Sequence, residues 1–277
     1  MIARLPRIRI FGVVVSVNLT LRPIHYACVS GGKDSLFMLK VILSNPNKYP
    51  LDMVVHYQLE IDWEWAERTV DYMESECKKY GIKFLRIKPR KSWHEIYKTR
   101  FMPTGKVRWC NKEYKMDAER QIRKWIKEQN CRPIAYIGFC ADETQRFKYE
   151  IGEWKDQDIC YPLAEEGINE SEVLIWARTV PLFNDWYKYF KRQGCMMCPM
   201  LSRLELAYLC VYYPDKYAEY ISYVKEYEDK FGKQWKTGLW ADDLDKLIRN
   251  KWVKILKNKM SYEQITIDEW LGKETEA

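Results

Sequence analysis

Hydrophobic positions in the first half of the chain alternate between two periodicities. Short apolar runs bounded by turn or polar residues predict strands over 24–29, 51–57, 83–87 and 133–139. Between these runs, apolar residues recur at steps of three and four, which predicts helices. The positions that define this spacing are Leu36, Leu39, Leu43, Ala66, Val70, Met73, Cys77, Ala118, Ile122, Trp125 and Ile126. Strands that alternate with helices in this way predict a parallel sheet covered on both faces, which is an α/β fold.

After about residue 160 the pattern becomes helical and rich in aromatic residues. One predicted helix face carries Tyr217, Tyr220, Ile221, Val224, Tyr227 and Phe231, and another carries Leu244, Leu247, Ile248 and Ile255. We therefore expect an α/β domain over 1–160 and a mainly helical C-terminal region over 161–277. The apolar stretch 8–17 predicts a strand, because it is shorter than the ~20 residues that a membrane span needs.

Composition fits a water-soluble enzyme or binding protein that acts on an anion. Hydrophobic residues make up 47% and charged residues 31% of the chain, and the net charge is +7. A positive excess suits a nucleotide or a nucleic-acid backbone, and basic residues cluster in the segments 78–91 and 98–115. Nine cysteines without an export signal favour thiol or metal chemistry in a reducing cytoplasm over a disulfide framework. We expect a cytoplasmic protein with no membrane partner.

The stretch "SGGKDS", residues 30–35, lies between the first buried strand and the first helix. Its glycines let the backbone approach a ligand closely, and the free amides at the helix start favour an anion. Lys33 adds a positive charge, while Ser30 and Ser35 add hydroxyl groups. Asp34 would repel a phosphate, so we expect it either to cap the helix or to accept a magnesium ion or its waters. The sequence thus predicts a phosphate-binding loop.

These six residues resemble the PP-loop signature of the N-type ATP pyrophosphatases. The resemblance implies an adenine nucleotide alpha hydrolase-like fold that binds ATP and Mg²⁺ and cleaves ATP between its α and β phosphates. Cofactor binding is then expected at Ser30, Gly31, Gly32, Lys33, Asp34 and Ser35. The same analogy puts adenine at the end of the second strand, near His56 and Tyr57.

Three further stretches resemble the phosphoadenylyl-sulfate (PAPS) reductase family in order and character. They are "RWCNKEYK" (108–115), "GFCADETQR" (138–146) and "GCMMCP" (194–199). The resemblance covers roughly residues 22–200 and implies that Asp142, Glu143 and Arg146 lie near the phosphates or the leaving group. The family pattern usually has arginine and serine where this chain has Cys140 and Thr144.

Cysteine spacing suggests a metal centre. Cys195 and Cys198 form a C-x-x-C motif, which lets two thiolates meet one metal, and Cys110 lies far upstream. Adenylyl-sulfate reductases hold a [4Fe–4S] cluster with a Cys-Cys pair and a distant C-x-x-C, but Asn111 stands where the second cysteine of that pair would be. Three thiolates would leave one iron open to a sulfide, and Cys160 or Cys140 would close the site as a fourth ligand. Zinc accepts the same thiolates.

We therefore expect an ATP pyrophosphatase-type sulfurtransferase with Lys33, Asp34 and Arg146 as catalytic residues. The acceptor could be a nucleic acid, DNA or tRNA, since the chain also resembles Dnd-type DNA phosphorothioation proteins. A sulfur-donor protein is a further expected partner.

Two alternatives stay open. One is a sulfonucleotide reductase or an adenylating ligase without a sulfur step. The reductases carry a nucleophilic cysteine in a C-terminal tail, whereas no cysteine follows Cys210 here, which argues against reduction. The other is a non-catalytic nucleotide- or nucleic-acid-binding protein whose cysteines hold a structural zinc.

Overall fold

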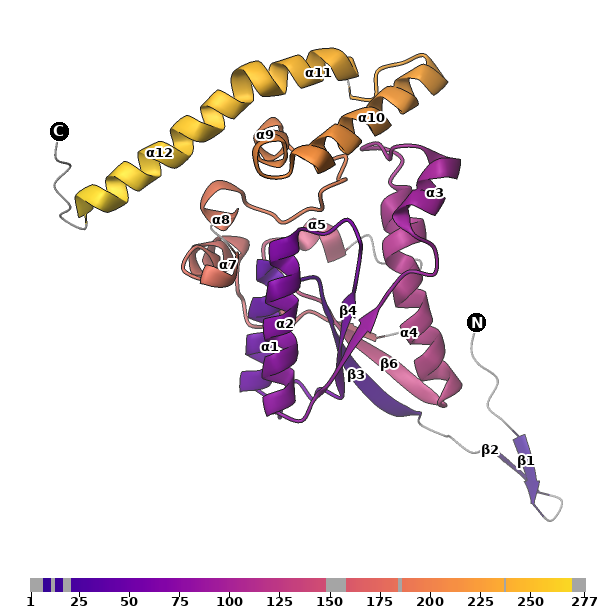
Figure 1. The fold of residues 1–277 in the computed structure, drawn as a ribbon. Helices are drawn as coiled ribbons and strands as arrows, with labels where there is room; N and C mark the ends of the chain where they lie inside the picture. The colour runs from indigo at the N-terminus through magenta and orange to yellow at the C-terminus, as the bar shows by residue number, and fades with distance from the viewer. Residues whose placement is uncertain are drawn as a thin grey trace.

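The computed structural model describes residues 7–10, 13–16, 21–147, 158–183, 186–236 and 238–270. Its centre is a five-stranded parallel sheet in the order β5-β4-β3-β6-β7, drawn in Figure 1. The strands are β3 (Arg22–Val29), β4 (Met53–Tyr57), β5 (Lys83–Ile87), β6 (Cys131–Tyr136) and β7 (Asp158–Cys160). The predicted α/β fold with a parallel sheet is confirmed.

The predicted strands match the observed ones closely, except at the end of β6. The prediction extended this strand to residue 139, but it ends at Tyr136. Past that point Gly138 passes the first turn of helix α1, where an added Cβ would lie 3.0 Å from the carbonyl oxygen of Asp34. The chain leaves the sheet here because its backbone packs against this helix start.

Alternate residues of the strands belong to two different apolar layers, because neighbouring strand residues point to opposite faces. Tyr26, Met53 and Val55 pack with Ile122 and Ile126 of α4 (Met116–Glu128). Ala27, Val29 and Val54 belong to the layer that includes α1 (Lys33–Ser44) and α2 (Glu64–Lys79). Figure 1 shows these helices on the two sides of the sheet. Both faces are covered, as predicted.

Strand order sets the position of the glycine-rich loop. The chain runs outward from β3 through β4 to β5, then returns to the other side of β3 to form β6 and β7. The order therefore reverses between β3 and β6, and ligands of open α/β sheets bind beyond the carboxyl ends of the strands at such a point. Residues 30–35 follow β3 directly and lie at this switch point.

Two helical elements connect β5 to α4. Helix α3 (Trp93–Arg100) begins with a capping box in which Ser92 and Glu95 satisfy each other's backbone amides. The π-helix η1 (Cys110–Lys115) then runs directly into α4.

The chain beyond β6 is almost entirely helical. Its elements are α5 (Thr144–Phe147), α6 (Pro162–Glu165), α7 (Glu170–Ala177), η3 (Pro181–Phe183), α8 (Trp186–Tyr189), α9 (Arg203–Tyr212), α10 (Pro214–Phe231), α11 (Ala241–Leu247), η4 (Ile248–Trp252) and α12 (Val253–Trp270). Tyr217, Tyr220 and Val224 of the predicted aromatic face are buried, whereas Phe231 is 45% exposed at the end of α10. One apolar core includes both α1 and α9, and the domain division at residue 160 stays a prediction.

The apolar stretch 8–17, which was predicted to be extended, lies in a region of two short paired strands. Strands β1 (Arg7–Ile10) and β2 (Val13–Ser16) pair antiparallel and form a two-stranded sheet of their own, separate from the central one. Within the described ranges, none of the helices combines the length and apolar character required to cross a membrane.

Candidate nucleotide and cysteine site

The loop after β3 has the tight backbone expected of an anion-binding loop. Gly31 adopts a φ of +73°, and a Cβ there would lie 2.7 Å from the carbonyl oxygen of Ala66, so only glycine fits. The Ser35 hydroxyl accepts a hydrogen bond from the Ser30 amide at 3.0 Å and lies 3.1 Å from the Ser30 hydroxyl. Helix α1 then begins after Gly32, which provides no side-chain cap. The amides at the helix start therefore lack a side-chain acceptor from their own N-cap residue.

A cavity of about 210 Å³ lies over this loop. Four of the predicted nucleotide-binding residues line it: Ser30, Gly32, Asp34 and Ser35. The rest of its wall includes Tyr57, Asp62, Lys115 and the segment around Arg192. Residues separated by more than 150 positions thus enclose one polar cavity at the switch point of the sheet.

Lys33 is placed differently from the other loop residues. Its side chain is 1% exposed, and its ammonium lies 2.6 Å from Asp34 Oδ1 and 3.6 Å from Glu170 Oε1. It does not belong to the cavity lining. The predicted catalytic lysine is therefore neutralised by two carboxylates in this structure, and its positive charge supports the position of Asp34.

Asp34 does not cap helix α1, so this alternative for its role is not observed. Its carboxylate contacts Lys33 and accepts a weak hydrogen bond from the Cys140 thiol at 3.8 Å. Burial raises the pKa of Asp34, although the Lys33 ammonium opposes this shift. Because Asp34 also lines the cavity, it remains available as an acceptor for a cation or its waters.

The turn after β6 holds the predicted residues Asp142, Glu143 and Arg146. The carboxylate of Glu143 accepts from the Cys140 amide at 3.0 Å and pairs with Arg146 at 2.5 Å. The Arg146 guanidinium lies 3.8 Å from the centre of the Phe139 ring, and Asp142 accepts from the first amide of α7. These side chains organise the turn and lie outside the cavity lining.

His56 and Tyr57 point in opposite directions from the end of β4. The His56 ring is 1% exposed; its Nδ1 lies 3.1 Å from the Val29 carbonyl oxygen and its Nε2 lies 3.8 Å from Glu67. Tyr57 lines the cavity, whereas His56 does not. Of the two residues that the family analogy placed near adenine, Tyr57 faces the cavity.

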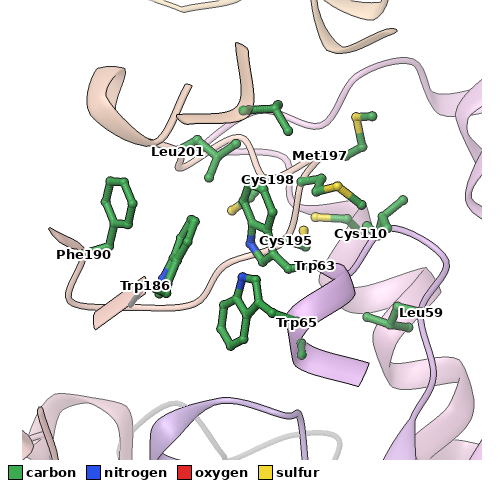
Figure 2. Close-up of a cluster of buried hydrophobic side chains, with 14 of the residues drawn as sticks. Leu59, Trp63, Trp65, Cys110, Trp186, Phe190, Cys195, Met197, Cys198 and Leu201 are labelled. Atoms are coloured by element: carbon green, nitrogen blue, oxygen red, sulfur yellow. The ribbon is translucent and has the colours of Figure 1, made fainter. Parts of the chain in front are cut away.

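Cys110, Cys195 and Cys198 lie in one cluster of buried side chains, shown in Figure 2. The loop that carries the C-x-x-C motif is fixed to the start of α2. The Met196 amide donates to the Ile61 carbonyl at 2.9 Å, and the Trp63 indole donates to the Gln193 carbonyl at 3.1 Å. The fold therefore brings Cys110 and the C-x-x-C motif into one buried cluster, and their role as metal ligands stays a prediction.

The thiols of Cys195 and Cys198 influence each other's proton affinity. The interaction with Cys195 lowers the pKa of Cys198, and the same interaction raises the pKa of Cys195. The positive charges of Arg192 and Lys115 also lower the pKa of Cys198. Among the two thiols, Cys198 is the one that carries a negative charge most readily.

The π-helix η1 explains why Cys110 and Lys115 face the same region. Hydrogen bonds in a π-helix run from residue i to i+5, so residues five apart stack, whereas an α-helix would turn them to different sides. The positive charge of Lys115 acts on all three thiols and on Asp62. Burial raises the pKa of Asp62 to about 6, against the opposing effect of Lys115.

The three thiols have the donor chemistry that iron–sulfur clusters and zinc require, and their surroundings are dry. In the described part of the chain, however, no three His, Cys, Asp or Glu side chains are gathered so that they could hold a metal ion. The proposed fourth ligand Cys140 lies beside Asp34 on the nucleotide side, and Cys160 is in β7. The metal centre therefore stays a prediction.

The basic segment 98–115 borders a hollow of about 830 Å³ along α3 and α4. Its lining includes Arg90, Lys91, Arg100 and Arg120, but also three carboxylates. Arg90 pairs with Asp117 at 2.5 Å, and Arg100 pairs with Glu113 at 3.0 Å. Part of the positive charge that the sequence shows in this region is thus neutralised by neighbouring acids.

Five polar residues of the cavity lining were not predicted: Asp62, Lys115, Tyr187, Arg192 and Gln193. Three of them had a signal in the sequence, since Lys115 belongs to the "RWCNKEYK" stretch and Arg192 and Gln193 directly precede "GCMMCP". Nothing in the sequence marks Asp62 or Tyr187 as cavity residues, because their position depends on contacts between distant segments.

The sheet order and the loop at its switch point define an α/β protein with a parallel sheet and a glycine-rich loop beyond the end of its central strand. The chain is 26% identical over 220 residues to the uncharacterized protein MJ0066 of Methanocaldococcus jannaschii. This alignment covers 76% of this chain and 44% of that protein. It is 25% identical over 243 residues to the uncharacterized protein MJ0973 of the same organism. This second alignment covers 80% of this chain and 54% of that protein. The chain thus spans about half the length of the curated relatives it matches.

Among solved structures, the U34-tRNA thiolase NcsA from Methanococcus maripaludis with its [4Fe-4S] cluster aligns with 86% of this chain and 73% of its own. The TM-score is 0.37 and the sequence identity 18%, which is too low for an argument about function. No protein-family model matches the chain.

Proposed function

We propose that the protein binds ATP or a related adenylyl nucleotide over residues 30–35, cleaves it at the α-phosphate and supports sulfur transfer at Cys110, Cys195 and Cys198. One observation carries this proposal: the nucleotide cavity and the cysteine cluster share a wall. Lys115 lines the cavity and acts on all three thiols, and the cavity residue Gly194 directly precedes Cys195.

The cavity has the groups that phosphate chemistry needs. Loop amides and the hydroxyls of Ser30 and Ser35 would donate to phosphate oxygens, and the Lys115 ammonium would balance their charge. An acceptor oxygen would attack the α-phosphorus. The bond from the α-phosphorus to the oxygen that bridges the α and β phosphates would break, and pyrophosphate would leave. Lys33 would hold Asp34 in place, and Asp34 would bind Mg²⁺ or its waters. A sulfur nucleophile would then displace AMP from the adenylate.

Cys110, Cys195 and Cys198 would hold a [4Fe–4S] cluster, with zinc as the alternative. A cluster held by three thiolates supplies an open iron that can bind a sulfide. The contribution of this chain's own residues is the buried thiol set and the nearby positive charges of Lys115 and Arg192, which favour thiolates.

The acceptor in this proposal is a nucleic acid, DNA or tRNA, and a separate protein would deliver the sulfur. The net charge of +7 and the arginine-lined hollow beside segment 98–115 support an anionic acceptor. A sulfonucleotide reductase or an adenylating ligase would use the same loop. The burial of Lys33 in ion pairs favours a further alternative, a non-catalytic binder with a structural zinc.

Two assays on anaerobically purified protein test the proposal. Conversion of ATP to AMP in the presence of Mg²⁺ and tRNA or DNA should be lost in Asp34→Asn and retained in Asp229→Asn, an exposed control. About four irons and four sulfides per chain should be lost in Cys195→Ala and retained in Cys210→Ala. If the protein contains zinc but no sulfide and forms no AMP, only the alternative of a non-catalytic binding protein with a structural zinc would remain.

A further inference from the structure

The segment 187–193, from Tyr187 to Gln193, lies directly against the loop 30–35. The Lys33 amide donates to the Tyr187 hydroxyl at 3.0 Å, and the Gln193 side-chain amide donates to the Ser30 carbonyl at 3.2 Å. A Cβ on Gly32 would lie 2.5 Å from Gln193 Oε1 and 3.3 Å from the Tyr187 hydroxyl. The segment thus approaches the backbone of Gly32 closely, and the C-terminal region forms part of the cavity wall.

The O–H group of Tyr187 is an unused hydrogen-bond donor among the described residues. It is buried, lines the cavity and accepts from the first amide of α1. Across the described residues, no acceptor is recorded for its own O–H. A hydroxyl that accepts from a helix N-terminus and lines a cavity is suited to donate onward to a ligand oxygen.

Arg192 supplies a positive charge to the same wall. One of its terminal nitrogens donates to the Met200 carbonyl, and its Nε lies 4.0 Å from Glu205 Oε1. Its side chain is 46% exposed, so other guanidinium donors are accessible from the cavity. Because Lys33 is turned into its ion pairs, Arg192 and Lys115 are the cations of the described residues that line this cavity.

We propose that segment 187–193 is a phosphate clamp: the Arg192 guanidinium and the Tyr187 O–H bind phosphate oxygens of the ligand, while Gln193 holds the Ser30 carbonyl in place. A guanidinium presents several donors in one plane, which matches the oxygens of a phosphate. The identity of the ligand as an adenine nucleotide rests on the proposed function, whereas the clamp itself requires only a phosphate.

Calorimetric titration of the full chain with ATP, AMP, adenosine and inorganic pyrophosphate tests the clamp. We expect Arg192→Gln to weaken ATP and pyrophosphate binding by about ten- to a hundredfold and to leave adenosine binding unchanged. Tyr187→Phe, which removes only the hydroxyl, should weaken ATP by about three- to tenfold. Arg203→Gln is the matched control, because Arg203 is exposed in the same region and outside the cavity lining.

Equal ATP affinities for Arg192→Gln and Arg203→Gln would overturn the clamp, and so would an equal loss for adenosine and ATP. AMP formation by the wild-type protein would still support the proposed function in either case. Pyrophosphate binding that depends on Arg192, without binding of any adenine compound, would support the clamp and remove the nucleotide function. Arg192→Gln could unfold because Glu205 loses its nearby charge. In that case the affinities of Arg192→Lys and Tyr187→Phe for ATP and adenosine are compared with those of Arg203→Gln instead.

Discussion

The indole of Trp63 donates a hydrogen bond to the backbone carbonyl of Gln193 at 3.1 Å. Trp63 immediately precedes α2 and is fully buried, and Gln193 lies two residues before Cys195. This bond ties the α/β sheet region to the loop that carries the C-x-x-C motif. The bond therefore helps to fix the position of this loop beside the start of α2.

Trp63→Phe should destabilise the protein by about 1 to 3 kcal/mol, because the partly buried Gln193 carbonyl would lose its donor. Urea denaturation monitored by circular dichroism measures the change in the free energy of unfolding. Trp240→Phe at an exposed position is the control, and equal losses in the two variants would contradict the role of the bond.

Gly31→Ala should destabilise more than Gly81→Ala. Both glycines have a positive φ, +73° and +68°, so both substitutions carry the same kind of backbone strain. Only at Gly31 would the added Cβ meet another atom, the Ala66 carbonyl oxygen at 2.7 Å. We expect an additional loss of about 1 to 3 kcal/mol in thermal or urea unfolding. A Gly31→Ala variant as stable as Gly81→Ala would show that the loop can move away.

Lys33→Met should lower the free energy of unfolding by about 2 kcal/mol, since Asp34 and Glu170 would lose their shared partner. Both carboxylates are partly exposed, which keeps the loss below that of a fully buried pair. Urea denaturation gives the value, with Lys78→Met on the exposed face of α2 for comparison. Equal stability of the two variants would mean that the ion pairs contribute nothing.

Asp62→Asn should make the protein more stable at high pH only. Burial raises the pKa of Asp62 to about 6, above its value of 3.8 in the unfolded chain. The folded state therefore holds the proton more tightly, and the contribution of Asp62 to stability falls as pH rises from about 4 to about 6. The variant should exceed the wild type by about 1 to 3 kcal/mol near pH 8 and match it below about pH 4. Asp229→Asn is the control. If the difference in the free energy of unfolding between Asp62→Asn and the wild type changes no more with pH than that of the control, the raised pKa of Asp62 would be contradicted.

Cys195→Ala should raise the pKa of Cys198, because the interaction with the Cys195 thiol is the largest cause of its lowered pKa. In metal-free protein, the pH dependence of Cys198 alkylation by iodoacetamide would then move to higher pH. Peptide mass spectrometry follows the residue directly. Cys77→Ala, in the core of α2, should leave the pH midpoint of Cys198 alkylation unchanged. An unchanged midpoint in Cys195→Ala would refute the influence of Cys195 on the pKa of Cys198.

Local sequence patterns were sufficient to predict the sheet and the glycine-rich loop. Strand β5 matches its predicted bounds of 83–87, and Cys77 is buried as the helix spacing required. Such features depend on neighbouring residues, whose periodicity the sequence displays directly. The helical C-terminal region was predictable for the same reason.

The composition of the cavity was much less predictable, because it depends on contacts between distant segments. Tyr187 and Arg192 follow α7, which packs against α1, and they line the same cavity as the loop residues. His56 was expected near adenine, but strand alternation turns its ring toward Val29 and leaves Tyr57 on the cavity. The sequence also gives no sign that Lys33 would be held by Glu170, a residue on another helix.

The position of segment 187–193 in the cavity wall has a consequence for biosynthesis. The sheet-side residues of the cavity end near Asp62, whereas Gly194, the last lining residue, leaves the ribosome roughly 130 residues later. At typical translation rates this is an interval of about ten seconds. During that time the growing chain carries a glycine-rich loop without its opposite wall. The cavity therefore has its complete lining only after segment 187–193 has been made, when the strands of the central sheet have already left the ribosome.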